Sequence, residues 1–189
     1  MSEMRARMKA SWALGVCLLV MVPVFPKRSH KAPPPPPSNY KPVNVFDPAR
    51  DPAKDLKDAI AEATQSKRRI LLEVGGDWCM WDQIMDRVFE NHPKLRELRD
   101  SHYVRVKIYY AKDNPNTEFL SHYPTIPDYP HFFVLDSSGT LFHSQRTKPF
   151  EQKKSYNVGK ITAFLKKWEP ESWWGRNPDP PEVLGKSQH

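Results

Sequence analysis

The spacing of apolar residues divides positions 51–168 into amphipathic helices and short strands. Residues 53–66 carry apolar side chains at the i, i+3, i+4 and i+7 spacing of one helical face, whereas residues 103–110 place them at every second position. The pattern predicts helices over Ala53–Ser66, Cys79–Glu90, Pro93–Leu98, Asn114–Tyr123 and Val158–Trp168. It predicts strands over Arg69–Val74, Tyr103–Tyr110, His131–Asp136 and Thr140–Ser144. This alternation indicates an α/β fold whose central sheet is covered on both faces.

Turn and cap residues support these limits. Asp51 precedes Pro52, a pair typical of the start of a helix. The stretch Ser137-Ser138-Gly139 lies between the last two predicted strands, and glycine supplies the positive φ that a hairpin turn needs. The sequence therefore predicts that the last two strands form a hairpin.

Prolines mark the ends of this domain. The chain has 20 prolines in 189 residues, including a run from Pro33 to Pro37 and a group at 178–181. Such a run favours an extended polyproline-type spacer. We expect a Pro-rich linker over residues 32–48, a folded domain over 49–170, and a loose tail over 171–189 that contains Trp173 and Trp174.

The first 31 residues have the composition of an export signal. Arg5, Arg7 and Lys9 precede an apolar stretch over residues 12–25, which is shorter than the ~20 residues that span a bilayer comfortably. Bulky residues and prolines occupy the place of a small-residue cleavage site. The segment is therefore interpreted as a secretory signal peptide or as an N-terminal membrane anchor through residues 12–25.

The net charge of +7 belongs mainly to this N-terminal segment. Residues 1–32 contain six basic residues and one acidic residue, a net of +5, so residues 33–189 carry only +2. A nearly neutral domain argues against a nucleic-acid partner, which would require a basic face.

Cysteine is scarce, and one of the two cysteines lies at a chemically favourable place. Cys17 falls within the apolar N-terminal stretch, and Cys79 falls where a predicted buried strand turns into a helix. The positive end of a helix stabilises a thiolate and lowers the pKa of its thiol. A buried cysteine without reactivity is the alternative. No metal-spaced His/Cys cluster or phosphate-binding glycine loop is present, so no metal or cofactor is expected.

Four elements in order resemble the thioredoxin-like superfamily, in particular its exported members with a Trp-Cys-x-x-Cys motif. They are the acid Glu73 on the strand before the cysteine, the pair Trp78-Cys79, the pair Tyr129-Pro130 before a strand, and the closing strand-turn-strand-helix. The resemblance implies a three-layer α/β/α sandwich with a central mixed sheet.

The same resemblance assigns roles to individual residues. Glu73 would be a proton carrier beneath the nucleophile, although a residue at a sheet edge that reaches solvent is the alternative. Pro130 would follow a cis bond and face Cys79, exposing the Tyr129 backbone to an extended substrate. Trp78 and Trp81 would line the substrate groove, with a core position favoured for Trp81.

The departure from the family is Asp82, which stands where the second cysteine would be. A carboxylate cannot resolve a mixed disulfide, so a dithiol cycle within one molecule is excluded. In one interpretation Asp82 caps the first turn of its helix. In the other it acts on Cys79, either by opposing ionisation of the thiol or by accepting a proton from an approaching thiol.

Two functions follow from these residues. The first is an exported monothiol protein that exchanges disulfides through Cys79 with an external resolving thiol. The second is a non-catalytic thioredoxin-fold module that binds protein in the cell envelope. Both imply protein thiols, disulfides or extended peptides as partners, and a location in the bacterial periplasm or on the inner membrane facing it.

Overall fold

The computed structural model of the protein describes residues 40–170. The predicted N-terminal signal or anchor, the first part of the predicted linker and the tail at 171–189 lie outside the described residues. Within residues 40–170, no helix combines the length and apolar character needed to cross a membrane.

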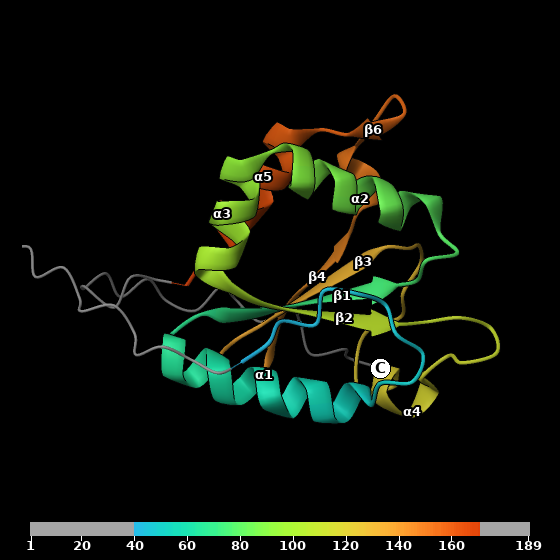
Figure 1. Ribbon diagram of the computed structural model, residues 1–189, viewed down its shortest axis with the longest axis vertical. Helices are drawn as coiled ribbons and strands as arrows, with labels where there is room; N and C mark the ends of the chain where they lie inside the picture. The colour runs from blue at the N-terminus through green and yellow to red at the C-terminus, as the bar shows by residue number, and fades with distance from the viewer. Residues whose placement is uncertain (1–39, 171–189) are drawn as a thin grey trace, which may run out of the picture. The chain divides into compact units, whose positions relative to one another are not determined.

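A four-stranded mixed sheet forms the centre of the domain (Figure 1). Its strand order is β2-β1-β3-β4, and the strands are β1 (Arg69–Gly75), β2 (Tyr103–Tyr109), β3 (His131–Leu135) and β4 (Leu141–Arg146). β1 runs parallel to β2, whereas β3 is antiparallel to both β1 and β4. β1 is buried from Ile70 to Gly75, as its short, mainly apolar run predicts, and Glu73 is buried with it.

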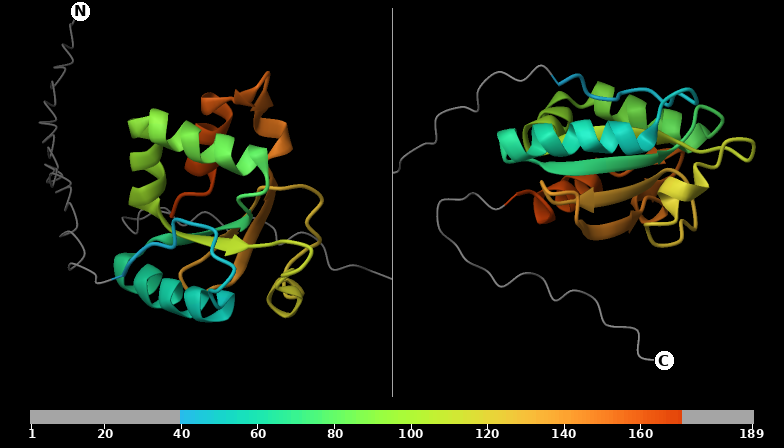
Figure 2. Two further views of the ribbon diagram at one scale, coloured as in Figure 1. Left: turned by 45° about the vertical axis from the view of Figure 1, so that its right-hand side comes forward. Right: turned by 90° about the horizontal axis from the view of Figure 1, so that it is seen from below.

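Helices cover both faces of the sheet, which gives three layers (Figures 1 and 2). One face packs against α1 and the opposite face against the core cluster of α2, α3 and α5. Their bounds are α1 (Pro52–Ser66), α2 (Met80–Asn91), α3 (Pro93–His102), α4 (Thr117–Leu120) and α5 (Val158–Lys167). Asp51 caps α1, because its side chain accepts the N–H groups of Ala53 and Lys54. The predicted thioredoxin-like sandwich is confirmed.

The predicted hairpin between β3 and β4 is present. Gly139 adopts φ of +89°, a conformation that favours glycine, and the Asp136 side chain accepts the N–H groups of Ser138 and Thr140. After β4 the chain adds a short helical turn and a small two-stranded ribbon that the periodicity did not predict. These are η1 (Lys148–Phe150), β5 (Glu151–Gln152) and β6 (Ser155–Tyr156).

Residues 40–48, here called the edge segment, pack along the outer edge of β2 rather than forming a free spacer. The Val43 carbonyl accepts the Lys107 N–H at 3.1 Å, and the Tyr40 hydroxyl donates to the Arg105 carbonyl at 3.4 Å. Val43 and Phe46 are both 5% exposed. The expected linker over 32–48 therefore contributes its last residues to the domain, because apolar side chains between the prolines gain free energy by burial.

Candidate functional site

Cys79 lies at the junction between β1 and α2. It occupies the N-cap of α2, with extended backbone angles of φ −95° and ψ 116°. Its N–H donates to the Gly76 carbonyl at 3.0 Å, and its own carbonyl accepts the Asp82 N–H at 3.1 Å. The thiol is half-buried, so it is fixed at the helix tip while still facing solvent.

The loop before β3 faces this thiol. The Tyr129–Pro130 peptide bond is cis, as predicted from the resemblance. The Cys79 Sγ lies 3.6 Å from the Tyr129 carbonyl oxygen. On its other side the loop is fixed by Thr147, whose hydroxyl donates to the Pro130 carbonyl at 2.6 Å. The structure therefore brings Cys79, Tyr129 and Pro130 together.

Aromatic side chains surround the thiol on the solvent side. Trp78 is 54% exposed, and its indole N–H donates to the Tyr110 carbonyl at 2.6 Å. The Tyr129 ring stacks on Tyr110 and meets the edge of Trp78, with centroids 4.6 and 5.7 Å apart. Met80 is also exposed. These side chains form an apolar rim beside Cys79.

Trp81 is partly buried and packs against the core cluster of α2, α3 and α5. Its ring centroid lies 5.1 Å from that of Tyr156. Its contacts agree with the core position that its place on the helical stripe favours.

Asp82 is buried directly beneath the thiol loop. Its side chain is packed so closely against Gly75 that a Cβ there would lie 2.1 Å from the Asp82 Oδ1. Neither carboxyl oxygen makes a hydrogen bond of normal geometry with a described residue, although the Cys79 thiol and the Gly76 backbone lie near enough to act on its ionisation, and the side chain does not cap the helix. A buried carboxyl that is so weakly hydrogen-bonded favours its neutral form.

The electrostatics of Asp82 and Cys79 follow from this burial. Burial first, and the negative charge of Glu73 second, raise the pKa of the Asp82 carboxyl to about 8. Burial and the neighbouring Asp82 carboxylate also raise the pKa of the Cys79 thiol to about 11. This direction is opposite to the one that the helix end alone favours, and it agrees with the predicted opposition by Asp82.

Glu73 is buried between two strands and is paired with a base. β1 lies between β2 and β3, so the alternative of a sheet-edge residue that reaches solvent is wrong. The Glu73 Oε2 accepts bonds from the Arg105 Nε at 3.0 Å and Nη2 at 2.7 Å. The pair compensates two charges that would otherwise be costly inside the protein.

This ion pair extends into a network that the sequence did not reveal. Asp86 accepts a bond from the Arg105 Nη2 at 2.7 Å and from the Lys107 Nζ at 2.5 Å. Burial opposes ionisation of Asp86, but Lys107 and Arg105 outweigh it and lower the pKa of this carboxyl. The one available signal was the position of Asp86 four residues after Asp82, on the same face of α2.

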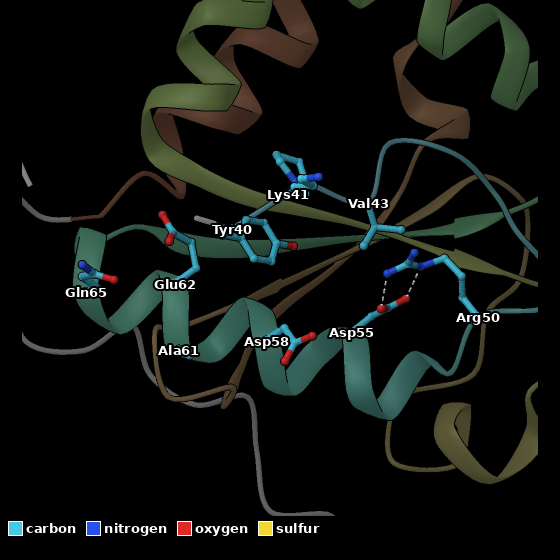
Figure 3. A pocket seen from close by; sticks show the side chains of 10 residues that line it. Tyr40, Lys41, Val43, Arg50, Asp55, Asp58, Ala61, Glu62 and Gln65 are labelled. Carbon is cyan, nitrogen blue, oxygen red and sulfur yellow. Dashed lines mark hydrogen bonds and ion pairs between the residues drawn. The ribbon is translucent and has the colours of Figure 1, made fainter. Parts of the chain in front are cut away.

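A pocket in the described part of the chain lies away from Cys79. It measures about 690 Å³ and lies between the edge segment and α1 (Figure 3). Its buried Asp55 is already paired with Arg50. None of its lining residues is a predicted site residue. Within residues 40–170, no group of three or more His, Cys, Asp or Glu side chains is arranged to hold a metal ion.

Comparison with known proteins supports the fold. Residues 51–137 match a family described as thioredoxin-like. No curated protein sequence matches the chain significantly. A disulphide isomerase from Xylella fastidiosa Temecula1 is 25% identical and superposes with a TM-score of 0.56, covering 66% of this chain and 97% of its own. The oxidised C-terminal domain of Neisseria meningitidis DsbD is 17% identical and superposes with a TM-score of 0.50. The match covers 66% of this chain and 99% of the DsbD domain.

The family match spans α1 through the turn after β3, and the solved structures extend the likeness over about two thirds of the chain. The mixed sheet, the cysteine at the tip of α2 and the cis-proline loop that faces it agree with that match. Residues 51–137 therefore match the thioredoxin-like family, and the described domain has the thioredoxin-like fold.

Proposed function

We propose that the protein exchanges disulfides with protein substrates through Cys79 alone, with a thiol from outside the chain resolving the mixed disulfide. The observation that carries this proposal is the half-exposed Cys79 thiol, 3.6 Å from the Tyr129 carbonyl beside Pro130. This arrangement leaves room for a substrate sulfur at the helix tip. Cys79 is the only cysteine between residues 18 and 189, which requires the resolving thiol to come from elsewhere.

The first half of the reaction forms a mixed disulfide. Cys79 loses its proton to the solvent, and its thiolate attacks one sulfur of a substrate disulfide. The Cys79–substrate S–S bond forms, the original S–S bond breaks, and the second substrate sulfur leaves as a thiolate that is then protonated. Since the pKa of Cys79 is raised to about 11, this step should accelerate steeply with pH.

The second half assigns a role to Asp82. The incoming thiol transfers its proton to the Asp82 carboxylate and attacks the substrate sulfur of the mixed disulfide. Cys79 leaves as a thiolate and recovers the proton from Asp82. A carboxyl whose pKa is about 8 suits this exchange, because both of its protonation states are populated near neutral pH.

The resolving thiol can belong to the substrate itself. In that case the substrate ends with a different disulfide and without net oxidation or reduction, which is disulfide isomerisation. The Xylella fastidiosa structure, at 25% identity, is named as a disulphide isomerase, and this supports the same chemistry for the present chain. Small thiols would instead release the substrate as a mixed disulfide that a second thiol can reduce.

Substrate would bind as an extended peptide beside Tyr129 and Pro130. Main-chain groups of this loop would pair with the peptide, and the exposed Trp78 and Met80 would cover apolar residues next to the target cysteine. A folded substrate with its disulfide buried would not reach the Cys79 thiol.

Mass spectrometry of the intact full-length chain carrying Cys17→Ser, which leaves Cys79 as its one thiol, tests the proposal. The reduced protein is mixed with glutathione disulfide between pH 7 and 9, and a substrate protein with scrambled disulfides is refolded in its presence. We expect a single adduct on Cys79 and faster recovery of native disulfides. Cys79→Ser should lose both effects, and a Cys17→Ser chain that forms no adduct and gives no acceleration would contradict the proposal.

A non-catalytic peptide-binding module is the second candidate, because the raised pKa of Cys79 leaves little thiolate at neutral pH. Its test is peptide affinity. A binding module would hold extended peptides equally well as wild type and Cys79→Ser, and its Trp78→Ala variant would lose affinity without any change in disulfide exchange.

We also propose export of the domain through the apolar stretch at residues 12–25, with residues 32–39 as a spacer. Fractionation of a bacterium that expresses the full-length chain tests this proposal. Recovery from the periplasm or the inner membrane is expected, and replacing residues 12–25 with a polar sequence of equal length should retain the chain in the cytoplasm.

A further inference from the structure

The edge segment touches the charge network through Phe46. Phe46 is almost fully buried, and the Lys107 ammonium lies 4.1 Å from the centroid of its ring. A cation over an aromatic face is attracted to it, most strongly where water is excluded. Lys107 is 3% exposed, so this contact is dry.

Lys107 connects this contact with the candidate site. Its ammonium donates to Asp86 on α2 at 2.5 Å, and its positive charge favours the ionised form of Asp82, also on α2. Phe46 thus contacts Lys107, whose positive charge acts on the ionisation of Asp82. No candidate site residue lies on the edge segment, which enters the domain more than 30 positions before Cys79.

We propose that Phe46 is a positioning residue for the Cys79 site. Its ring holds the Lys107 ammonium against Asp86 and keeps water away from it, and this fixes the charge that acts on Asp82. Without the ring, water would surround the ammonium and screen its attraction for the Asp82 carboxylate. The inference rests on the proposed function for its relevance to catalysis, since Phe46 would adjust the residue that transfers the proton. The contacts of Phe46 and Lys107 are the same whether or not the protein exchanges disulfides.

Other titratable groups also act on Asp82. They are Glu73 on β1, Cys79 before α2 and Tyr156 on β6, and Glu73 is in turn bonded to Arg105 on β2. Of the groups that act on Asp82, Lys107 is the one whose charged atom lies over the Phe46 ring. A change at Phe46 therefore reaches Asp82 through Lys107 rather than through the other groups.

The test is an NMR titration of the Asp82 carboxyl carbon in the full-length chain labelled with ¹³C-aspartate. Phe46→Ala should move the midpoint of this titration upward by about 0.5 pH unit, because the carboxylate loses part of a nearby positive charge. Phe46→Leu keeps the apolar cover without the aromatic face and should give a smaller upward shift. In a Lys107→Gln background, Phe46→Ala should leave the midpoint unchanged.

Val43→Ala is the matched control, since Val43 is as buried as Phe46 on the same segment but its side chain packs in the cluster with α1, and the substitution keeps the backbone bond to the Lys107 N–H. It should lower the thermal unfolding temperature without moving the Asp82 midpoint. An unchanged midpoint in Phe46→Ala, or an equal shift in Val43→Ala, would overturn the inference. The titration needs no exchange activity, so a protein that fails to exchange disulfides can still confirm or contradict it.

Discussion

The Asp82 carboxyl affects two quantities that are measured separately, the acidity of Cys79 and the resolution of its mixed disulfide. Its burial beneath Gly75 places a negative charge beside the thiol whenever the carboxyl ionises. The same carboxyl accepts and returns a proton in the proposed second half-reaction. Substitution at this residue should therefore change the two half-reactions in opposite directions.

Asp82→Asn should make Cys79 easier to ionise. Removing the carboxylate withdraws one cause of the raised thiol pKa, so the pH midpoint of Cys79 alkylation should fall by about one unit. Iodoacetamide labelling followed by mass spectrometry measures this midpoint. Asp77→Asn removes an exposed acid two residues before Cys79 and should leave the midpoint in place.

The same variant should slow the resolving step. Without Asp82 the incoming thiol has no buried proton acceptor, so reduction of a preformed Cys79–glutathione mixed disulfide near pH 7.5 should be slower by roughly tenfold or more. Stopped-flow or quenched mass spectrometry follows this decay. Equal acceleration of both half-reactions would contradict a proton-transfer role for Asp82.

Asp82 should also make folding stability depend on pH. Its pKa rises from an ordinary value of 3.8 to about 8 on folding, so the native state binds more protons than the unfolded state between these values. The stability that the neutral carboxyl contributes is present below pH 3.8 and is lost as the pH rises through 8.

Urea unfolding of wild type and Asp82→Asn at pH 5 and pH 8 measures this dependence. The difference between the two proteins isolates Asp82 from other titrating groups, such as His131, whose pKa burial lowers to about 4. We expect Asp82→Asn to gain stability relative to wild type as the pH rises. A constant difference would mean that Asp82 is already ionised at pH 5.

At the scale of elements, the end of β1 and the first turn of α2 are in contact through Gly75 and Asp82. Gly75→Ala would place a methyl group 2.1 Å from the Asp82 Oδ1 and should cost roughly 1–3 kcal/mol. The free energy of unfolding in urea tests this cost. In an Asp82→Ala background the methyl group has space, so the cost should largely disappear.

The buried pair of Glu73 and Arg105 ties β1 to β2. Glu73→Gln leaves the Arg105 guanidinium with Asp86 alone and should cost roughly 3 kcal/mol. Urea unfolding measures this loss.

Removing the charge of Glu73 should also lower the pKa of Asp82, because that charge is the second largest cause, after burial, of the raised Asp82 pKa. Lys54→Gln, which breaks an exposed pair with Asp58, should change stability by less than about 1 kcal/mol.

Hydrophobic periodicity predicted the helices and strands because each of them buries one continuous face of apolar side chains. The mainly apolar run of β1 and the i, i+3, i+4 pattern of α1 each predict one kind of element. The alternation in β2 has two interpretations. Arg105 and Lys107 could lie on a face exposed to solvent or on a buried face where acidic side chains compensate their charges, and the structure shows them buried. Only the positions of Glu73 and Asp86 in space decide between them.

The candidate site was predicted in its parts but not in its electrostatics. Cys79, Tyr129 and Pro130 follow from order along the chain. The burial of Asp82 against Gly75 depends on how closely α2 approaches β1, which a sequence of residue types does not encode. The edge segment was missed for a related reason, since prolines indicate extended backbone and say nothing about what packs against Val43 and Phe46.

At the scale of the whole molecule, the domain begins before the first helix. Two chains, one starting at Tyr40 and one at Ala49, test this boundary. The shorter chain loses the buried side chains of Val43 and Phe46 and should be less stable by about 3 kcal/mol. Equal urea midpoints would place the edge segment outside the folded unit.

The backbone contacts of the edge segment have a consequence for association between copies of the chain. The segment occupies the Lys107 N–H and the Arg105 carbonyl, two groups that β2 would otherwise present in a row along its open edge. An uncovered strand edge is a template for pairing with another chain and for aggregation. In a crowded compartment the edge segment would thus hinder a second copy of the chain from pairing with β2 and extending the sheet.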